Sequence, residues 1–183
     1  MEMAVTDFTS TDTAIDGLTI ITLKQVADER GTVRELYRVS TLAAAAVGFP
    51  GPIAQINVTE TARGALRGLH AEAVTKLVAV VSGAAYGAYV DLRADSATYA
   101  SVVTADLTPG TQVLVPSGVA NGFQALVDGT QYLYCFDREW QPGMPGRACH
   151  PLDPALAIPW PIAEPVLSDK DRNAPFLSEV TGR

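Results

Sequence analysis

The sequence contains few histidines and cysteines. Its 183 residues include two of each, and the cysteines are Cys135 and Cys149. Two cysteines are too few for a disulfide framework, so we expect reduced thiols and a cytoplasmic protein. Disulfides are therefore not expected to hold this fold together.

Basic residues are also scarce relative to acidic ones. The chain has 13 lysines and arginines against 20 aspartates and glutamates, which gives a net charge of −7. An acidic chain has no general attraction for nucleic acid or for an anionic membrane surface, so we predict neither partner. An anionic small molecule is compatible with this charge only where a few arginines gather locally.

Long apolar runs are missing as well. No segment approaches the roughly 18 apolar residues that a membrane helix needs. The first residues, MEMAVTDFTSTDT, lack the basic region and the apolar stretch of a secretory signal. The sequence therefore predicts no membrane span and no signal peptide.

What the chain does contain is a series of short segments rich in Val, Ile, Thr and Tyr, which predict β-strands. The turn sequences TPGT (108–111) and VDGT (127–130) each offer a glycine for a positive φ. Without helices between the strands, the pattern predicts an all-β antiparallel sandwich or barrel. The predicted strands lie within residues 18–23, 53–59, 76–83, 84–92, 99–107, 111–116, 123–127 and 131–136.

Only one segment predicts a clear short helix, STLAAAAVG at residues 40–48. Ser40 or Thr41 is expected to cap its N-terminus, and Gly48 is expected to end it. The length suits a single domain over residues 1–183, with the N-terminal segment and a proline-rich C-terminal segment packed on the barrel.

His70 raises the main chemical question, because it follows Arg67 by three residues in LRGLH. A lone histidine in a β protein is more often structural or exposed than catalytic. The other histidine, His150, is distant in sequence, and Glu72 would complete a set of only two metal ligands. Metal sites in such barrels usually need two or three histidines and a carboxylate, so we predict no metal. His70 is then either a general base or a residue without a chemical role.

Strand alternation places Lys76 on the same face as Val78. A lysine that points into a barrel needs an anion or a polarised oxygen, whereas one at a strand end reaches solvent. The same rule places Tyr132, Tyr134 and Phe136 on one face. An aromatic stripe of this kind is usually core, but a buried tyrosine hydroxyl needs a partner and can donate a proton.

No nucleophile elbow, phosphate-binding loop or dinucleotide fingerprint is present. Several segments nevertheless occur in an order that resembles the dTDP-4-dehydrorhamnose 3,5-epimerase family. They are LRGLH, KLV, YVDLR, VPSGVANGF, YLYC, DPALAIPWP and LSDKDRNAP, and the resemblance extends from DERG at residues 28–31 to about residue 175. It implies a cupin-like double-stranded β-helix, or jelly-roll barrel, with a few short helices.

The resemblance also implies roles for individual residues. His70 matches the family's base, Asp171 the carboxylate that orients it, Lys76 the group that stabilises an enolate, and Tyr134 the proton donor on the opposite face. The substrate-binding positions that it implies are Arg67, Gln55, Asn57, Asn121, Trp140 and Lys170, together with Arg30 from the second subunit of a homodimer.

The implied substrate is a dTDP-4-keto-6-deoxyhexose, and its chemistry explains these residue types. The hydrogens on C3 and C5 flank a ketone, so a neutral histidine can remove one and leave an enolate. A lysine stabilises the negative oxygen, and arginines bind the diphosphate. Proton transfer of this kind requires no redox cofactor or metal. Alternative functions are a dehydratase on a similar sugar and a non-catalytic sugar-binding barrel.

Three departures from the family pattern all affect expected substrate contacts. Asn121 replaces a pocket histidine, TVRE at 32–35 replaces aromatic residues and adds Arg34, and QPGMPGRACH at 141–150 replaces a stretch that usually carries a glutamate. The expected acid–base residues are intact. We therefore predict an active epimerase with altered substrate or regiochemistry, in which inversion at C3 alone is favoured over inversion at both carbons.

Overall fold

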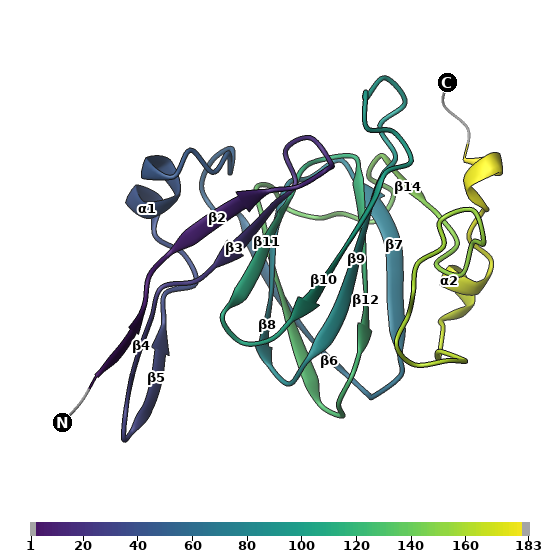
Figure 1. Ribbon diagram of the computed structural model, residues 1–183. Coiled ribbons are helices and arrows are strands. Elements are labelled where there is room, and N and C mark those ends of the chain that lie inside the picture. Colours follow the sequence, from purple (N-terminus) through teal and green to yellow (C-terminus); the bar gives the residue numbers. More distant parts are fainter. Residues whose placement is uncertain (1–2, 181–183) are drawn as a thin grey trace.

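The computed structural model describes residues 3–180, and its elements are nearly all β-strands (Figure 1). The parts of the single-domain prediction that concern residues 1–2 and 181–183 lie outside the described residues. The helices are α1 (Val39–Ala44) and α2 (Asp169–Arg172), followed by a 3-10 helix, η1 (Leu177–Glu179). The strands are β1 (Ala4–Thr6), β2 (Thr9–Asp12), β3 (Thr19–Thr22), β4 (Gln25–Asp28), β5 (Gly31–Arg34), β6 (Gln55–Thr61), β7 (Leu66–Glu72), β8 (Lys76–Ser82), β9 (Ala85–Asp91), β10 (Val102–Leu107), β11 (Thr111–Val115), β12 (Val119–Ala125), β13 (Thr130–Phe136) and β14 (Gly146–Ala148).

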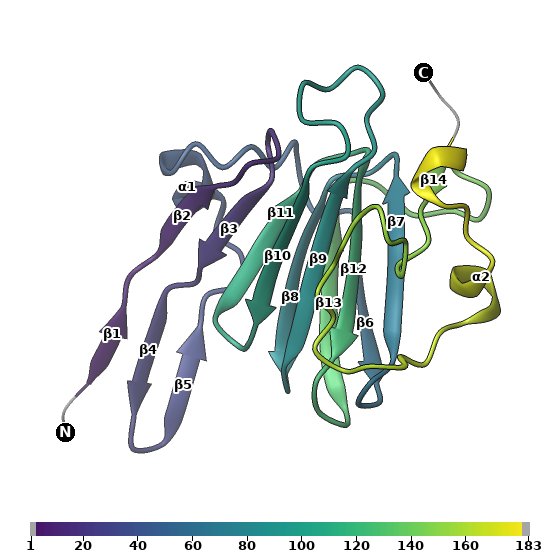
Figure 2. The same cartoon turned by 45° about the vertical axis from the view of Figure 1, so that its right-hand side comes forward.

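Two antiparallel sheets form the barrel. The larger has the order β2-β3-β11-β8-β13-β6 and the smaller the order β10-β9-β12-β7-β14. Their inner faces share one apolar core, which includes Val78 of β8, Val113 of β11, Phe123 of β12 and Tyr132 of β13. This arrangement confirms the predicted all-β jelly-roll barrel (Figures 1 and 2).

The barrel is covered on both outer faces. Residues Leu77, Leu133 and Cys135 of the larger sheet pack outward against the segment that contains α1, through Leu42 and its neighbours. Outward residues of the smaller sheet pack against Leu156 and the C-terminal segment, which crosses that sheet as loops (Figure 2). Because β8 is buried on both faces, its sequence is almost continuously apolar.

Each predicted strand segment overlaps a strand of the structure. The predicted turns at 108–111 and 127–130 are also present, with Gly110 and Gly129 at positive φ. The strands that the sequence did not predict are β1, β2, β4, β5, β7 and β14. Strands β1, β2 and β5 are exposed and β4 is half-buried, and none of these four has the apolar run on which the prediction depended. Glycine and arginine interrupt the apolar residues of β7 and β14.

The α1 helix exists, but the predicted caps are wrong. Arg38 is the N-cap residue and provides no side-chain cap, while Ser40 and Thr41 already lie inside the helix. At the C-terminus, Ala46 rather than Gly48 adopts the left-handed conformation, with φ 54°. The Val47 amide donates to the Leu42 carbonyl and the Ala46 amide to the Ala43 carbonyl, which is a Schellman motif. Packing of Leu42 and Val47 in the outer core accompanies this motif.

Strands β1, β4 and β5 form a separate three-stranded sheet that projects from the barrel in both views (Figures 1 and 2). All the residues of β1 and β5 are exposed, including Val33 at 76%. No helix within residues 3–180 is long and apolar enough to cross a membrane.

Candidate active site

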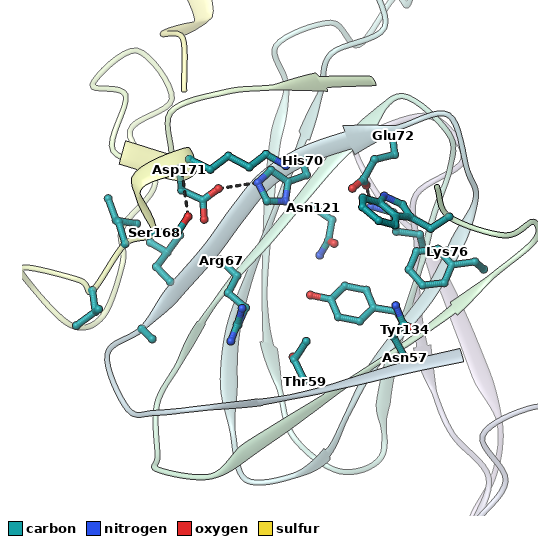
Figure 3. A pocket seen from close by; sticks show the side chains of 17 residues that line it. Asn57, Thr59, Arg67, His70, Glu72, Lys76, Asn121, Tyr134, Ser168 and Asp171 are labelled. Carbon is teal, nitrogen blue, oxygen red and sulfur yellow. Dashed lines mark hydrogen bonds and ion pairs between the residues drawn. The ribbon is translucent and has the colours of Figure 1, made fainter. Parts of the chain in front are cut away.

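A cavity of about 670 Å³ opens between the two sheets, and residues from both walls line it (Figure 3). Strands β6, β8 and β13 form one wall, β7 and β12 form the other, and the segment around α2 closes one side. The lining residues include most of those predicted for the site, namely Asn57, Arg67, His70, Lys76, Asn121, Tyr134, Trp140, Lys170 and Asp171.

His70 and Asp171 are 101 residues apart in sequence, yet their side chains are in direct contact. Nε2 of His70 donates to Oδ1 of Asp171 at 2.6 Å (Figure 3). Asp171 is only 4% exposed, and Ser168 fixes its helix because the Ser168 side chain accepts a bond from the Asp171 amide at 3.1 Å. The structure thus joins the predicted histidine to its predicted carboxylate.

The pKa of Asp171 is lowered by its surroundings. Burial alone would raise the pKa, but the hydrogen bond from His70 and the histidine's charge outweigh burial, with help from Ser168 and the Gly68 amide. Asp171 therefore stays ionised near neutral pH and acts as the acceptor for His70. An ionised partner favours the tautomer of His70 in which Nε2 carries the proton.

Close contact between β7 and β12 brings Asn121 beside His70. The two residues are register partners, and the ladder shifts between Asn121 and Phe123. A Cβ on Gly68 would lie 2.5 Å from the Cα of Gly122, so only glycine fits at this crossing. The Asn121 side chain donates through Nδ2 to the Tyr132 hydroxyl at 3.1 Å.

Lys76 enters the cavity from β8, as the family resemblance implied. Strand alternation had placed it on the Val78 face and had left open whether that face is internal. Lys76 is 3% exposed and forms an ion pair with Glu72 at the end of β7. Burial alone would raise the pKa of Glu72, but the charge and hydrogen bond of Lys76 lower it overall. The lysine therefore does not reach solvent, and a carboxylate accompanies it inside the barrel.

The predicted aromatic stripe of β13 also faces inward. Tyr134 lies between Tyr132 and Phe136, with ring centroids 4.9 Å and 5.9 Å away, and Tyr132 stacks on Phe123 at 4.0 Å. Burial raises the pKa of Tyr134 well above its usual value, and the neighbouring Tyr132 adds to this shift. The hydroxyl thus keeps its proton at neutral pH and points into the cavity (Figure 3).

The remaining predicted contacts lie around the mouth of the cavity. Arg67 donates through Nε to the Thr61 hydroxyl at 3.1 Å. Gln55 is not a lining residue, but it orients two that are. Its Nε2 donates to Oδ1 of Asn57 at 3.1 Å, and its Oε1 accepts from the Trp140 amide at 2.7 Å.

Arg30 is the second predicted residue, after Gln55, that does not line this chain's own cavity. It lies in the turn between β4 and β5, its side chain is 79% exposed, and it pairs with Asp28 at 2.6 Å. Arg34, on β5, bonds to Gln25 at 2.8 Å and also lies outside the cavity lining. Among residues 3–180, no group of three His, Cys, Asp or Glu side chains is arranged to hold a metal ion.

Several residues that line the cavity were not among those predicted from the sequence. Glu72 was considered only as a metal ligand, although the period of a strand places it on the same face as His70. Phe136 was predicted to share a face with Tyr134 but was given no role. Thr59 shares the face of Gln55 and Asn57 in the predicted strand 53–59, whereas Ser168 had no signal in the sequence. Each of these four residues lines the cavity.

A jelly-roll barrel with a histidine–aspartate pair, a lysine and a tyrosine around one internal cavity defines an acid–base enzyme for a small polar molecule. The family model of dTDP-4-dehydrorhamnose 3,5-epimerase matches residues 12–179 of the chain. The chain belongs to this family and is an isomerase of the epimerase class, so the resemblance seen in the sequence is confirmed.

Individual relatives agree with this assignment. A dTDP-4-dehydrorhamnose 3,5-epimerase from Streptomyces griseus is 35% identical over 93% of this chain and 87% of its own length. A dTDP-4-dehydrorhamnose 3-epimerase from Streptomyces niveus is 36% identical over 91% and 82%. A crystal structure of an epimerase from Legionella pneumophila Philadelphia 1, in complex with dTDP-4-keto-L-rhamnose, superposes with a TM-score of 0.88 at 32% identity, covering 96% of this chain and 95% of that one.

Proposed function

We propose that this enzyme inverts C3, C5 or both in a dTDP-4-keto-6-deoxyhexose. The observation that carries the proposal is the 2.6 Å bond between His70 and buried Asp171 in a cavity that also contains Lys76 and Tyr134. Binding alone needs no such set of residues, and membership in an epimerase family disfavours the dehydratase alternative.

The first step is removal of a proton from the carbon beside the ketone. Nδ1 of His70 accepts that proton, and the electron pair of the C–H bond becomes the C=C bond of an enolate. Negative charge collects on the ketone oxygen, where the Lys76 ammonium stabilises it. Asp171 stabilises the imidazolium that forms. The step moves only a proton, so it balances without an oxidant, a reductant or a metal.

Inversion requires that a proton return to the other face of the enolate. His70 belongs to β7 in the smaller sheet, whereas Tyr134 belongs to β13 in the larger sheet, so the two side chains enter from opposite walls (Figure 3). Tyr134 is protonated and points into the space between the walls. It therefore donates to the face opposite His70, and solvent later restores its proton.

The nucleotide part of the substrate is assigned to the mouth of the cavity. Arg67 and Lys170 bind the diphosphate by charge, and Trp140, which is 39% exposed, provides a ring for the thymine to stack on. Asn57 and Asn121 contact the sugar, and Gln55 holds Asn57 and Trp140 in place.

We further propose that two chains form a homodimer in the cytoplasm, with residues 1–183 of each acting as one catalytic domain. The projecting sheet of β1, β4 and β5 has little core of its own, which favours a partner surface. Arg30 lies in a turn of that sheet and is exposed, so it can reach the diphosphate site of a second subunit. Two buried free cysteines suit a reducing compartment.

The test is incubation with dTDP-4-keto-6-deoxyglucose in deuterated water, followed by proton NMR. Deuterium incorporation at C3 or C5 with inversion supports the proposal, and we expect C3 to be the main inverted centre because Asn121 is not an acid. Loss of water would indicate a dehydratase, and no change would indicate a binding protein. His70→Asn should abolish exchange, whereas His150→Asn, which changes the histidine outside the cavity, should not.

A further inference from the structure

Glu72 occupies a position in the cavity that the proposed reaction does not yet explain. It is the last residue of β7, two positions after His70, and its side chain enters the cavity from the same wall (Figure 3). Its carboxylate contacts the ammonium of Lys76, four residues further on at the start of β8. Within residues 3–180, Glu72 is the only carboxylate that pairs with Lys76.

The environment of Lys76 makes this contact important. The lysine is 3% exposed, and the neighbouring lining residues include the aromatic rings of Tyr134 and Phe136. A buried ammonium without a counter-ion is strongly disfavoured relative to the neutral amine. A neutral amine would stabilise a developing oxyanion far less well than an ammonium does.

Other charged groups face the same space. His70 lies on β7, Lys170 and Asp171 lie on α2, and Arg67 lies further along β7. Asp171 is bonded to His70 and so does not serve as the counter-ion of Lys76. Lys170, Arg67 and a protonated His70 are cationic and would favour loss of the Lys76 proton if Glu72 were neutral.

We propose that Glu72 is a positioning residue that keeps Lys76 charged and directs its ammonium toward the ketone oxygen of the substrate. The inference rests on the proposed function, in which Lys76 stabilises the enolate. Glu72 itself does not transfer a proton in this scheme. When the enolate forms, the ammonium lies between two anions, the carboxylate and the new oxyanion, and stabilises both.

The test begins with Glu72→Gln, which keeps the size of the side chain and removes its charge. The readout that does not depend on activity is the 13Cε NMR signal of Lys76 against pH, assigned by its absence in Lys76→Met. We expect the amine to lose its proton at least one pH unit lower in Glu72→Gln than in the native protein. Glu72→Asp, which keeps the charge, should restore most of the difference, and Glu60→Gln, an exposed change on β6, should have no effect.

Activity should follow the same pattern. In Glu72→Gln the alkaline limb of the kcat profile for deuterium exchange should move to lower pH by the same amount, while dTDP binds within threefold of the native affinity. An unchanged Lys76 titration, or a loss of kcat that is equal at every pH, would overturn the role of Glu72. If the native protein exchanges no deuterium, the proposed function fails, but the NMR titration still decides whether Glu72 holds the charge of Lys76.

Discussion

Replacing Asp171 with Asn tests the central pair of the site, because Asn keeps the shape of the side chain and removes only its charge. The imidazolium that forms on His70 then lacks a buried counter-ion. We expect slower proton abstraction with nearly unchanged binding of dTDP, since the Asp171 side chain bonds to the base and no bond joins it to Trp140 or Arg67 among the described residues. The affected quantity should therefore be kcat for exchange.

The geometry gives the size of this effect. Nε2 of His70 lies 2.6 Å from Asp171, so the centres of the two charges are about 4 Å apart. At an effective dielectric constant of roughly 20, this separation corresponds to about 4 kcal/mol. The His70 side chain is 27% exposed, and screening by solvent reduces the useful part to about 2–4 kcal/mol. With roughly 1.4 kcal/mol for each factor of ten, kcat should fall about 30- to 1000-fold.

The assay is the rate of deuterium entry at saturating substrate, measured by NMR beside a dTDP titration. Asp169→Asn is the matched control, because it removes an exposed carboxylate from the same short helix. The control should exchange at the native rate. A fall of less than threefold in Asp171→Asn, or an equal fall in the control, would refute the role of the dyad.

Three further changes have distinct expected outcomes. Tyr134→Phe should retain deuterium exchange through His70 but lose most of the inverted product, and inversion at the native rate would remove Tyr134 as the donor. Arg30→Ala should weaken dTDP binding about tenfold, because it removes a charge from the diphosphate site of the partner. Stability should not change, because the side chain is exposed. A native monomer that binds dTDP and turns over substrate would contradict a contribution from the partner. Asp91 is fully buried, and although burial opposes ionisation, bonds from Arg93, Ser96 and Thr98 hold its pKa well below the ordinary 3.8. The contribution of Asp91 to stability is therefore complete above about pH 4 and is lost as the pH falls toward the pKa of Asp91 in the folded protein. Asp91→Asn should lower the Tm at pH 7 and flatten the acid dependence of Tm below pH 4. An acid dependence equal to that of the native protein would exclude this contribution.

The strands of the barrel were predictable where apolar patterning is strong. Strand β8 reads as a strand from its Val-rich run, and the alternation within it placed Lys76 on the same face as Val78. Strand β7 was not predicted, although it holds His70, because Gly68 and Arg67 interrupt its apolar residues. The crossing with β12 that requires Gly68 is a tertiary contact, and no local pattern reveals it.

The site was less predictable than the fold from local pattern alone. The pairing of His70 with Asp171 joins residues that are 101 positions apart, and only the family resemblance connected them. The ion pair of Glu72 and Lys76 was not predicted, because the sequence pattern left open whether Lys76 points into the barrel or reaches solvent. A Lys76 that points into the barrel would need an anion, but β7 was not recognised as a strand, so no strand period pointed to Glu72.

The position of α2 has a consequence for the order in which the enzyme is made. The last barrel strand, β14, ends at Ala148, and Asp171 follows only after the loops that cross the smaller sheet. These loops attach to the barrel near the site through the bridge between Ala65 and Val166. A ribosome therefore releases every strand of the barrel before it releases the carboxylate that orients the base. Catalytic competence is therefore acquired only after all the barrel strands have been made, when the segment that carries α2 docks.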